Sequence, residues 1–197
     1  MLFRSTRQRQ LHAPNGRSSL ALPRSNIGRV TTATTPTSPT TTPPVLRAWE
    51  RWSGTWAGRL LVSGAVWLRA PYFLTAAPVI QRLEPGRSEV TLANWWLVHN
   101  HLGTVHAIAS CNLAEYAMGT LAEVTVPSTH RWIPLGMTVE YKAKATTDLR
   151  AVAVFDHPPA FDDTREDLDA EVTITDATGV EVVHAAIRVR ISPRPAR

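Results

Sequence analysis

The segment over residues 104–124 constrains the fold more than any other part of this chain. It reads TVHAIASCNLAEYAMGTLAEV, and Pro127 follows closely, as is common beyond a helix C-terminus. At helical spacing, one stripe contains Ile108, Asn112, Glu115, Gly119 and Ala122, and the opposite stripe contains Leu113, Ala117, Leu121 and Val124. A helix that is apolar on both sides is covered on both sides. We therefore expect Glu115 to be buried beside polar groups or in a solvent-filled cleft.

Short runs typical of β-strands lie on both sides of this helix. The expected strands are 78–83 and 88–96 before it, and 137–145, 149–155, 170–175 and 181–191 after it. The pieces TVEYKAKA, VTITD and IRVRI alternate apolar and polar residues, which is typical of a sheet with one covered face. Turns are expected at Pro85-Gly86 and at DATG over 176–179, and a solvated acidic loop over 162–169. This order predicts an α+β fold in which a curved antiparallel sheet wraps around one long central helix.

The N-terminal part of the chain differs in composition from the rest. Residues 1–49 carry seven Arg and no acid, whereas the rest of the chain carries 14 basic and 16 acidic side chains. The net charge of +5 therefore does not indicate a nucleic-acid-binding face, and no nucleic-acid partner is expected. Residues 1–44, rich in Arg, Ser, Thr and Pro, predict a disordered tail. Residues 45–197 predict a single domain that begins with an amphipathic helix, interrupted by glycines, over about 45–68.

Composition also bears on location and cofactors. The expected location is cytoplasmic. Because the tail has the composition of a mitochondrial transit peptide, the mitochondrial matrix is the alternative location. No membrane span is expected, because the run from Leu60 to Leu68 is far shorter than the roughly 20 residues required. Cys111 is the only cysteine, which excludes an intrachain disulfide and a Cys-based zinc site. His99 and His101 lack acidic or Cys ligands at suitable spacing, so we expect no metal and no other cofactor.

Two longer motifs flank the helix, NHLGTVHA at 100–107 and RWIPLGMTVEY at 131–141. With them the chain resembles the hot-dog superfamily, in particular its thioesterase-like, DUF4442-type branch, over about Pro71 to Ile191. The signature of that branch is an Asn, a Gly and a His before the helix and an acid on it, here Asn100, Gly103, His106 and Glu115. The resemblance implies an acyl-CoA or other acyl-thioester hydrolase. It also implies a homodimer or dimer of dimers with sites at the protomer interface.

Thioester hydrolysis needs a base or nucleophile and hydrogen-bond donors for the developing oxyanion. Glu115 is the candidate base or nucleophile. The amides at 106–107 would lie at the positive end of the helix, where an oxyanion is stabilised. Asn100 would orient a water or the carbonyl, and His106 would fix the loop or polarise the thioester. Asn112, one turn before Glu115, would hydrogen-bond its carboxylate.

The expected substrate contacts fall into two groups: Gly103, Ala107 and Asn112 around the helix start, and Arg131, Lys142 and Lys144 for the phosphates of CoA. One departure from the superfamily pattern concerns the helix start. Many of its thioesterases carry two glycines directly after the His, where this chain has Ala107 and Ile108. The Cβ atoms of these two residues would narrow the approach of an acyl carbonyl.

The same residues also fit structural roles. Glu115 is suited to an ion pair with Arg131, Lys142 or Lys144 across a dimer. His106 is suited to capping the helix, and Asn100 to closing a turn. A second hypothesis is therefore a non-catalytic acyl-thioester or lipid-binding dimer that uses the same cavity. A hydratase on this fold would need a His and an acid converging on one substrate carbon, and the spacing from His106 to Glu115 fits a thioesterase better.

Overall fold

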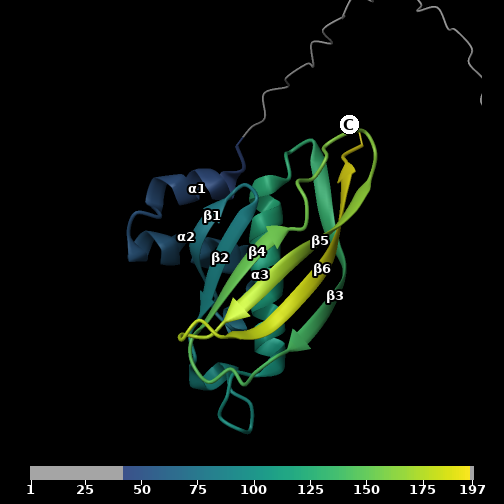
Figure 1. Ribbon diagram of the computed structural model, residues 1–197. Coiled ribbons are helices and arrows are strands. Elements are labelled where there is room, and N and C mark those ends of the chain that lie inside the picture. Colours follow the sequence, from purple (N-terminus) through teal and green to yellow (C-terminus); the bar gives the residue numbers. More distant parts are fainter. Residues whose placement is uncertain (1–41, 196–197) are drawn as a thin grey trace, which may run out of the picture. The chain divides into compact units, whose positions relative to one another are not determined.

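The structure is a computed structural model that describes residues 42–195. The tail predicted over residues 1–44 lies almost entirely outside the described residues, so its disorder stays a prediction. The described part contains three α-helices, two short 3-10 helices and six strands (Figure 1). None of the described helices is long and apolar enough to cross a membrane.

The N-terminal helix expected over 45–68 is in fact two helices. They are α1 (Pro44–Trp52) and α2 (Trp56–Arg69), and a 3-10 turn, η1 (Pro71–Thr75), follows them. The chain starts a new helix because the Thr55 hydroxyl accepts a hydrogen bond of 3.1 Å from the Gly58 N–H, a typical N-cap. Gly58 also permits the reversal, since a Cβ there would lie 1.8 Å from the Trp52 carbonyl oxygen. The prediction of one helix was therefore wrong.

Six antiparallel strands form one sheet in the order β1-β2-β4-β5-β6-β3. Their bounds are β1 (Val79–Glu84), β2 (Arg87–Leu92), β3 (His130–Tyr141), β4 (Leu149–Phe155), β5 (Glu166–Thr175) and β6 (Glu181–Pro193). The two edges of the sheet are thus β1 and β3. The predicted turns after β1 and after β5 are confirmed, with Gly86 and Gly179 at φ angles of 85° and 87°.

Three strands have bounds that differ by four residues or more from the sequence prediction. The second strand ends at Leu92, and the residues after it lead into a short 3-10 helix, η2 (Trp96–Val98). β3 begins at His130 instead of at 137. β5 begins at Glu166, inside the acidic stretch that was expected to be a loop. Cross-strand ion pairs hold these acids in the strand: Asp167 with Arg190, and Asp169 with Arg188.

The sheet curves around α3 (Ala107–Thr125), the helix predicted from the apolar segment (Figure 1). Leu113, Ala117 and Leu121 of α3 are fully buried in the core. A buried hydrogen bond of 2.8 Å joins the hydroxyls of Ser88 on β2 and Thr120 on α3. The prediction of one long helix wrapped by at least five strands is confirmed.

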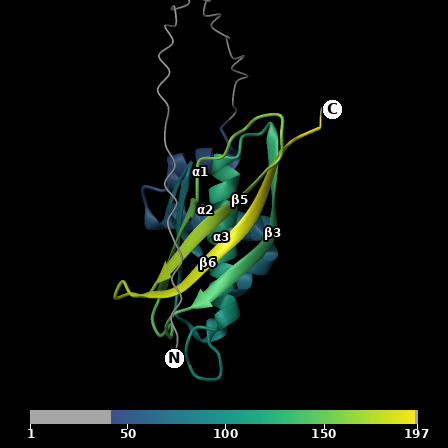
Figure 2. The ribbon, with the colours of Figure 1, turned by 45° about the vertical axis from the view of Figure 1, so that its right-hand side comes forward.

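One side of α3 is not covered by residues 42–195, contrary to the expectation that both sides are buried. Ile108, Glu115 and Glu123 are exposed along this side. Figure 2 shows β3 at the sheet edge beside α3. Met137 of β3 is also exposed, although it pairs with the buried Ile187 of β6. The sheet of one chain therefore covers only part of the helix.

Candidate active site

Asn100 closes the loop that leads into α3. Its Oδ1 accepts hydrogen bonds from the N–H groups of Leu102 and Thr104, at 2.9 and 3.3 Å. Its Nδ2 donates to the Thr104 hydroxyl at 2.9 Å. Gly103 has a φ of 73°, in the left-handed region that favours glycine. In the single chain, Asn100 and Gly103 thus shape the loop. Asn100 closes a turn, which is the structural role that the sequence also allowed for it.

His106 is the N-cap of α3. Its Nδ1 accepts a hydrogen bond of 3.0 Å from the Ile108 N–H. A neutral imidazole that accepts at Nδ1 carries its proton on Nε2. The side chain is exposed, so the Nε2–H is the group left for a substrate or a partner. The capping role considered for His106 is therefore present, and it fixes the tautomer of the ring.

Most backbone donors at the start of α3 are already occupied. The His106 N–H donates to the Val98 carbonyl at 2.7 Å, and the Ile108 N–H is used by the cap. The Ala107 N–H has no acceptor among the residues that the structure describes. Of the two amides predicted at 106–107 for an oxyanion, only that of Ala107 is available, at the positive end of α3.

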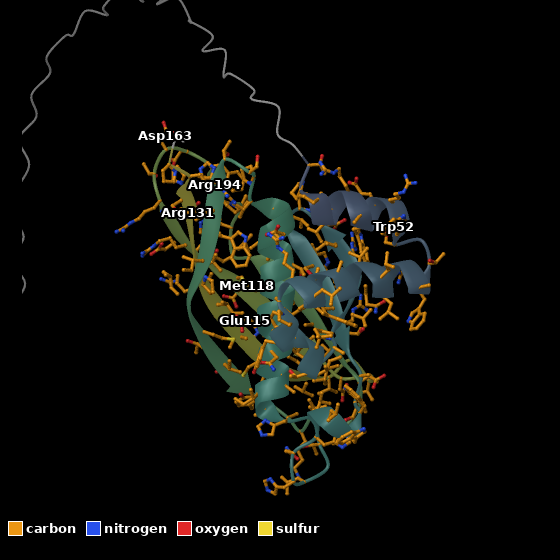
Figure 3. All side chains as sticks on the ribbon, turned by 180° about the vertical axis from the view of Figure 1, so that it is seen from behind. Trp52, Glu115, Met118, Arg131, Asp163 and Arg194 are labelled. Atoms are coloured by element: carbon orange, nitrogen blue, oxygen red, sulfur yellow. The ribbon has the colours of Figure 1, made fainter. Side chains whose placement is uncertain are left out.

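Glu115 lies on the open side of α3 that faces β3 (Figure 3). Its side chain is exposed in this chain, so the expectation of burial was wrong for the single chain. It forms no ion pair with any described residue. Lys142, one of its considered partners, instead pairs with Glu181 at 2.9 Å. The Glu115 carboxylate is therefore available for chemistry or for a partner chain.

Glu115 lines two cavities, and these connect the helix with the second motif. The smaller cavity, of about 300 Å³, lies between Glu115 and residues 134–137 of β3. The larger, of about 430 Å³, extends over α3 towards α1 and α2. Its lining is mainly apolar and includes Val45, Val66, Phe73, Met118, Trp132 and Pro134. The carboxylate thus sits where an apolar cavity meets the sheet edge.

His106 and Asn112 line a different cavity, of about 180 Å³, together with His99 and Ala109. Glu115 does not line it. His106 and Glu115 are nine positions apart in the sequence, which corresponds to about 13 Å along a helix. No hydrogen bond joins Asn112 to Glu115 within the described part of the chain, so that predicted contact is absent here. One chain therefore presents the acid and the helix start as two separate half-sites.

A contact close to Glu115 was missed by the sequence analysis. The Cys111 Sγ lies 3.1 Å from the Tyr141 Oη, which joins α3 to the end of β3. The hydrogen bond with Cys111, together with burial, raises the pKa of Tyr141 to about 12. Tyr141 therefore keeps a neutral hydroxyl near the site. Its partner Cys111 lies one helical turn before Glu115 on α3. Its place at the end of the second motif was the available signal.

The three cations expected to bind CoA phosphates do not gather in one chain. Arg131 is near the start of β3, where its Nε donates to the Ser192 hydroxyl at 3.2 Å. Lys142 follows the other end of β3, roughly 36 Å away at the usual rise of a strand. Lys144 is exposed beyond it. Figure 3 shows Arg131 close to Arg194 and Asp163 and well separated from Glu115.

Comparisons with solved structures show the fold class. Thioesterase PA1618 from Pseudomonas aeruginosa, solved as a mutant, matches with a TM-score of 0.59 and 14% identity, over 68% of this chain and 94% of that chain. PA5026 from the same organism, named a probable thioesterase, matches with a TM-score of 0.59 and 22% identity, over 65% of this chain and 91% of that chain. These likenesses show the hot-dog fold of thioesterase-like proteins, as predicted.

Sequence comparison then places the chain within this class. Residues 58–191 match the family described as "Domain of unknown function (DUF4442)". The genomics protein APC5556 shares 39% identity and a TM-score of 0.66, over 76% of this chain and 99% of that chain. The chain therefore belongs to the DUF4442 family, which confirms the resemblance carried by the two motifs. None of the curated proteins compared with the chain matches it.

Proposed function

We propose that this protein hydrolyses acyl thioesters, acyl-CoA in particular, with Glu115 as the catalytic base or nucleophile. The observation that carries the proposal is the position of Glu115. It is a carboxylate with no ion-pair partner among the described residues, at the edge of an apolar cavity of about 430 Å³. One neighbour that shares the fold is named a thioesterase and another a probable thioesterase, which supports the same reaction class.

In the base mechanism, Glu115 takes a proton from a water whose oxygen attacks the thioester carbonyl carbon. The resulting oxyanion is stabilised by the Ala107 N–H at the positive end of α3. Collapse of this intermediate breaks the carbon–sulfur bond. The thiolate leaves and is protonated, and the products are a carboxylic acid and a free thiol. In the nucleophile mechanism, the carboxylate attacks the same carbon, the carbon–sulfur bond breaks, and the thiolate leaves and is protonated. Water then hydrolyses the mixed anhydride, which releases the carboxylic acid and regenerates the Glu115 carboxylate.

Both mechanisms require the Ala107 N–H and the Glu115 carboxylate to act on the same carbonyl group. A single chain does not bring these two groups together. Ala107 and Glu115 are eight residues apart, roughly 12 Å along the helix. We infer that the site is completed in a dimer, where the helix start of one chain meets Glu115 of the other. The edge strand β3 supports this assembly. Its outward backbone groups have no strand partner among the described residues, and Ile133, Leu135 and Met137 are exposed on it.

The same dimer would gather the separated cations. If two β3 strands pair antiparallel, the start of one strand lies beside the end of the other. Arg131 of one chain would then approach the Lys142 end of its partner, next to Lys144. Together they would provide the positive charge that CoA phosphates need. The acyl chain would occupy the apolar cavity lined by Phe73 and Met118.

The test is a panel of acyl-CoA substrates with detection of the released thiol. Replacing Glu115 with Gln keeps the size of the side chain and removes its basicity, so turnover should fall by about 10²-fold or more. Glu50→Gln, on the exposed side of α1, is the matched control and should keep wild-type turnover. Asn100→Ala should reduce turnover less, because Asn100 acts through the loop. Wild-type turnover in Glu115→Gln would show that Glu115 is neither base nor nucleophile.

A second function, non-catalytic binding of acyl thioesters, is favoured by one observation. The amides of His106 and Ile108 are occupied, so the helix start offers fewer oxyanion donors than a site with several free amides. Under this hypothesis, acyl-CoA binds the dimer in calorimetry and no thiol is released. Glu115→Gln would then leave affinity nearly unchanged. Substrate turnover by the wild type, lost in Glu115→Gln, rejects the binding-only function.

A further inference from the structure

The helix α2 is apolar on the side that faces away from the rest of the domain. Ala57, Leu61, Ala65 and Leu68 form one stripe at helical spacing, and all are exposed, with Leu68 at 78%. The side that faces the domain is covered, with Val62 and Ser63 buried. An apolar stripe on a helix is normally covered by another surface. In the single chain, the outward stripe of α2 has no cover among the described residues.

Exposed aromatic side chains extend this stripe at both ends. Trp52 and Trp56 lie at the turn between α1 and α2 and are 45% and 70% exposed, and Tyr72 in η1 is 59% exposed. We call Trp52, Trp56, Leu61, Leu68 and Tyr72 the helical-pair face. Figure 3 shows Trp52 on the side of the helix pair away from β3. Because α2 packs on β1, the sheet edge opposite β3, a dimer through β3 leaves this face free.

The charges around the helical-pair face are almost all positive. Helices α1 and α2 carry four Arg and one acid, namely Arg47, Arg51, Arg59, Arg69 and Glu50. Arg51 and Arg69 are exposed and form no ion pair with a described residue. The sequence over residues 1–41 adds six further Arg and no acid. Two copies of such a face would repel each other, whereas an anionic surface would attract it.

We propose that the helical-pair face docks on an anionic lipid surface. Trp and Tyr rings are well accommodated at the boundary between headgroups and acyl chains, and Arg side chains at the rim contact lipid phosphates. The apolar stripe of α2 enters the boundary region as the apolar side of an interfacial helix does. The large cavity lies next to this face, since Val66, Arg69 and Phe73 line it. Docking would therefore bring the cavity close to lipid, the source of poorly soluble acyl groups.

The test is flotation of the full chain with lipid vesicles in the absence of any substrate, which keeps it independent of the hydrolase proposal. The vesicles are phosphatidylcholine alone, or equal parts of phosphatidylcholine and phosphatidylglycerol. We expect binding to the anionic vesicles, weakened by salt because the Arg contribution is screened. The double variant Leu61→Ser and Leu68→Ser should lower the bound fraction at least tenfold. The matched control is Val180→Ser, an exposed apolar residue after the β5–β6 turn, which should bind as the wild type does.

Melting temperature and light scattering of the variants separate docking from folding and assembly. If the wild type binds neither type of vesicle, the proposal is overturned. Binding retained by the double variant would overturn it as well, because attraction would then come from the Arg residues without the apolar stripe. If the wild type instead forms an assembly larger than a dimer, and the double variant reverts to a dimer without any vesicle binding, a second copy covers this face and the proposal is wrong.

Discussion

Under the proposed function, in which the acyl chain occupies the large cavity, Gly119 sets how much of that chain the cavity holds, and replacing Gly119 with Val should shorten the preferred substrate. Gly119 lies on α3 and lines the cavity, and a Cβ there would lie 3.7 Å from the Trp132 Cη2, an ordinary van der Waals contact. The Cβ itself therefore fits without displacement. The two methyl groups of Val extend from it and occupy space that the acyl chain would otherwise fill. Val is also a better helix residue than Gly, so α3 should not be destabilised.

The size of the effect follows from hydrophobic transfer. Each methylene that leaves water contributes about 0.8 kcal/mol, or about fourfold in kcat/KM, for as long as the cavity has room. A Val side chain occupies about as much space as three methylene groups, so the optimum chain should shorten by about three carbons. The substrate that the wild type prefers should lose about 50-fold in kcat/KM, from about 2.4 kcal/mol of lost transfer energy.

The assay is kcat/KM across a series of straight-chain acyl-CoA substrates for wild type, Gly119→Val and a control. Gly64→Val is the control, because Gly64 is a helical glycine on α2 that does not line the cavity. It should leave the optimum chain length unchanged. A Gly119→Val protein with the wild-type melting temperature and the wild-type optimum would show that the acyl chain lies elsewhere.

Three further predictions concern assembly and charge. Met137→Glu, on the exposed inner face of β3, should prevent formation of the proposed dimer and leave a folded monomer, measured by light scattering with the melting temperature as the check on folding. Burial alone would raise the pKa of Glu89, but its hydrogen bonds from Arg150 and Arg87 lower it. Glu89→Gln should therefore cost about 1–3 kcal/mol in urea unfolding at neutral pH. The difference should shrink as the pH falls through the depressed pKa of the folded state. The hydrogen bond with Glu166 is the main cause that raises the pKa of His157, so its stabilising effect is present in acid and lost as the pH rises through the folded-state pKa. Glu166→Gln should lower the titration midpoint of His157 measured by NMR, and an unchanged midpoint would refute the assignment.

Local patterns were sufficient for the elements of the fold. The apolar periodicity from Ile108 to Val124 predicted α3, because a helix shows its covered sides every three to four residues. Strand alternation and the glycines at 86 and 179 predicted the hairpins, because these turns require positive φ. The same local patterns failed over 45–68. There the periodicity continues through the break, and the capping hydroxyl of Thr55 decides where α2 begins.

The candidate site depended on contacts between distant parts of the chain. The motifs identified Asn100, His106 and Glu115, and the resemblance to the hot-dog superfamily supplied roles for them. Spacing along the chain did not show that His106 would use its Nδ1 as a cap or that Glu115 would line a cavity with β3. The Cys111–Tyr141 contact was equally hidden, because it joins residues on two elements.

By itself, the sequence of this protein determined its long helix α3, most of its strands and its family, because these follow from short-range periodicity, turn chemistry and two contiguous motifs. Only the tertiary structure decided what each element covers. Sheet order put β3 at an edge, which left Glu115 on an open side of α3 and set Arg131 and Lys142 at opposite ends of one strand. Burial is a property of neighbours brought together by folding, so a pattern that predicts an apolar face does not say what will lie against it.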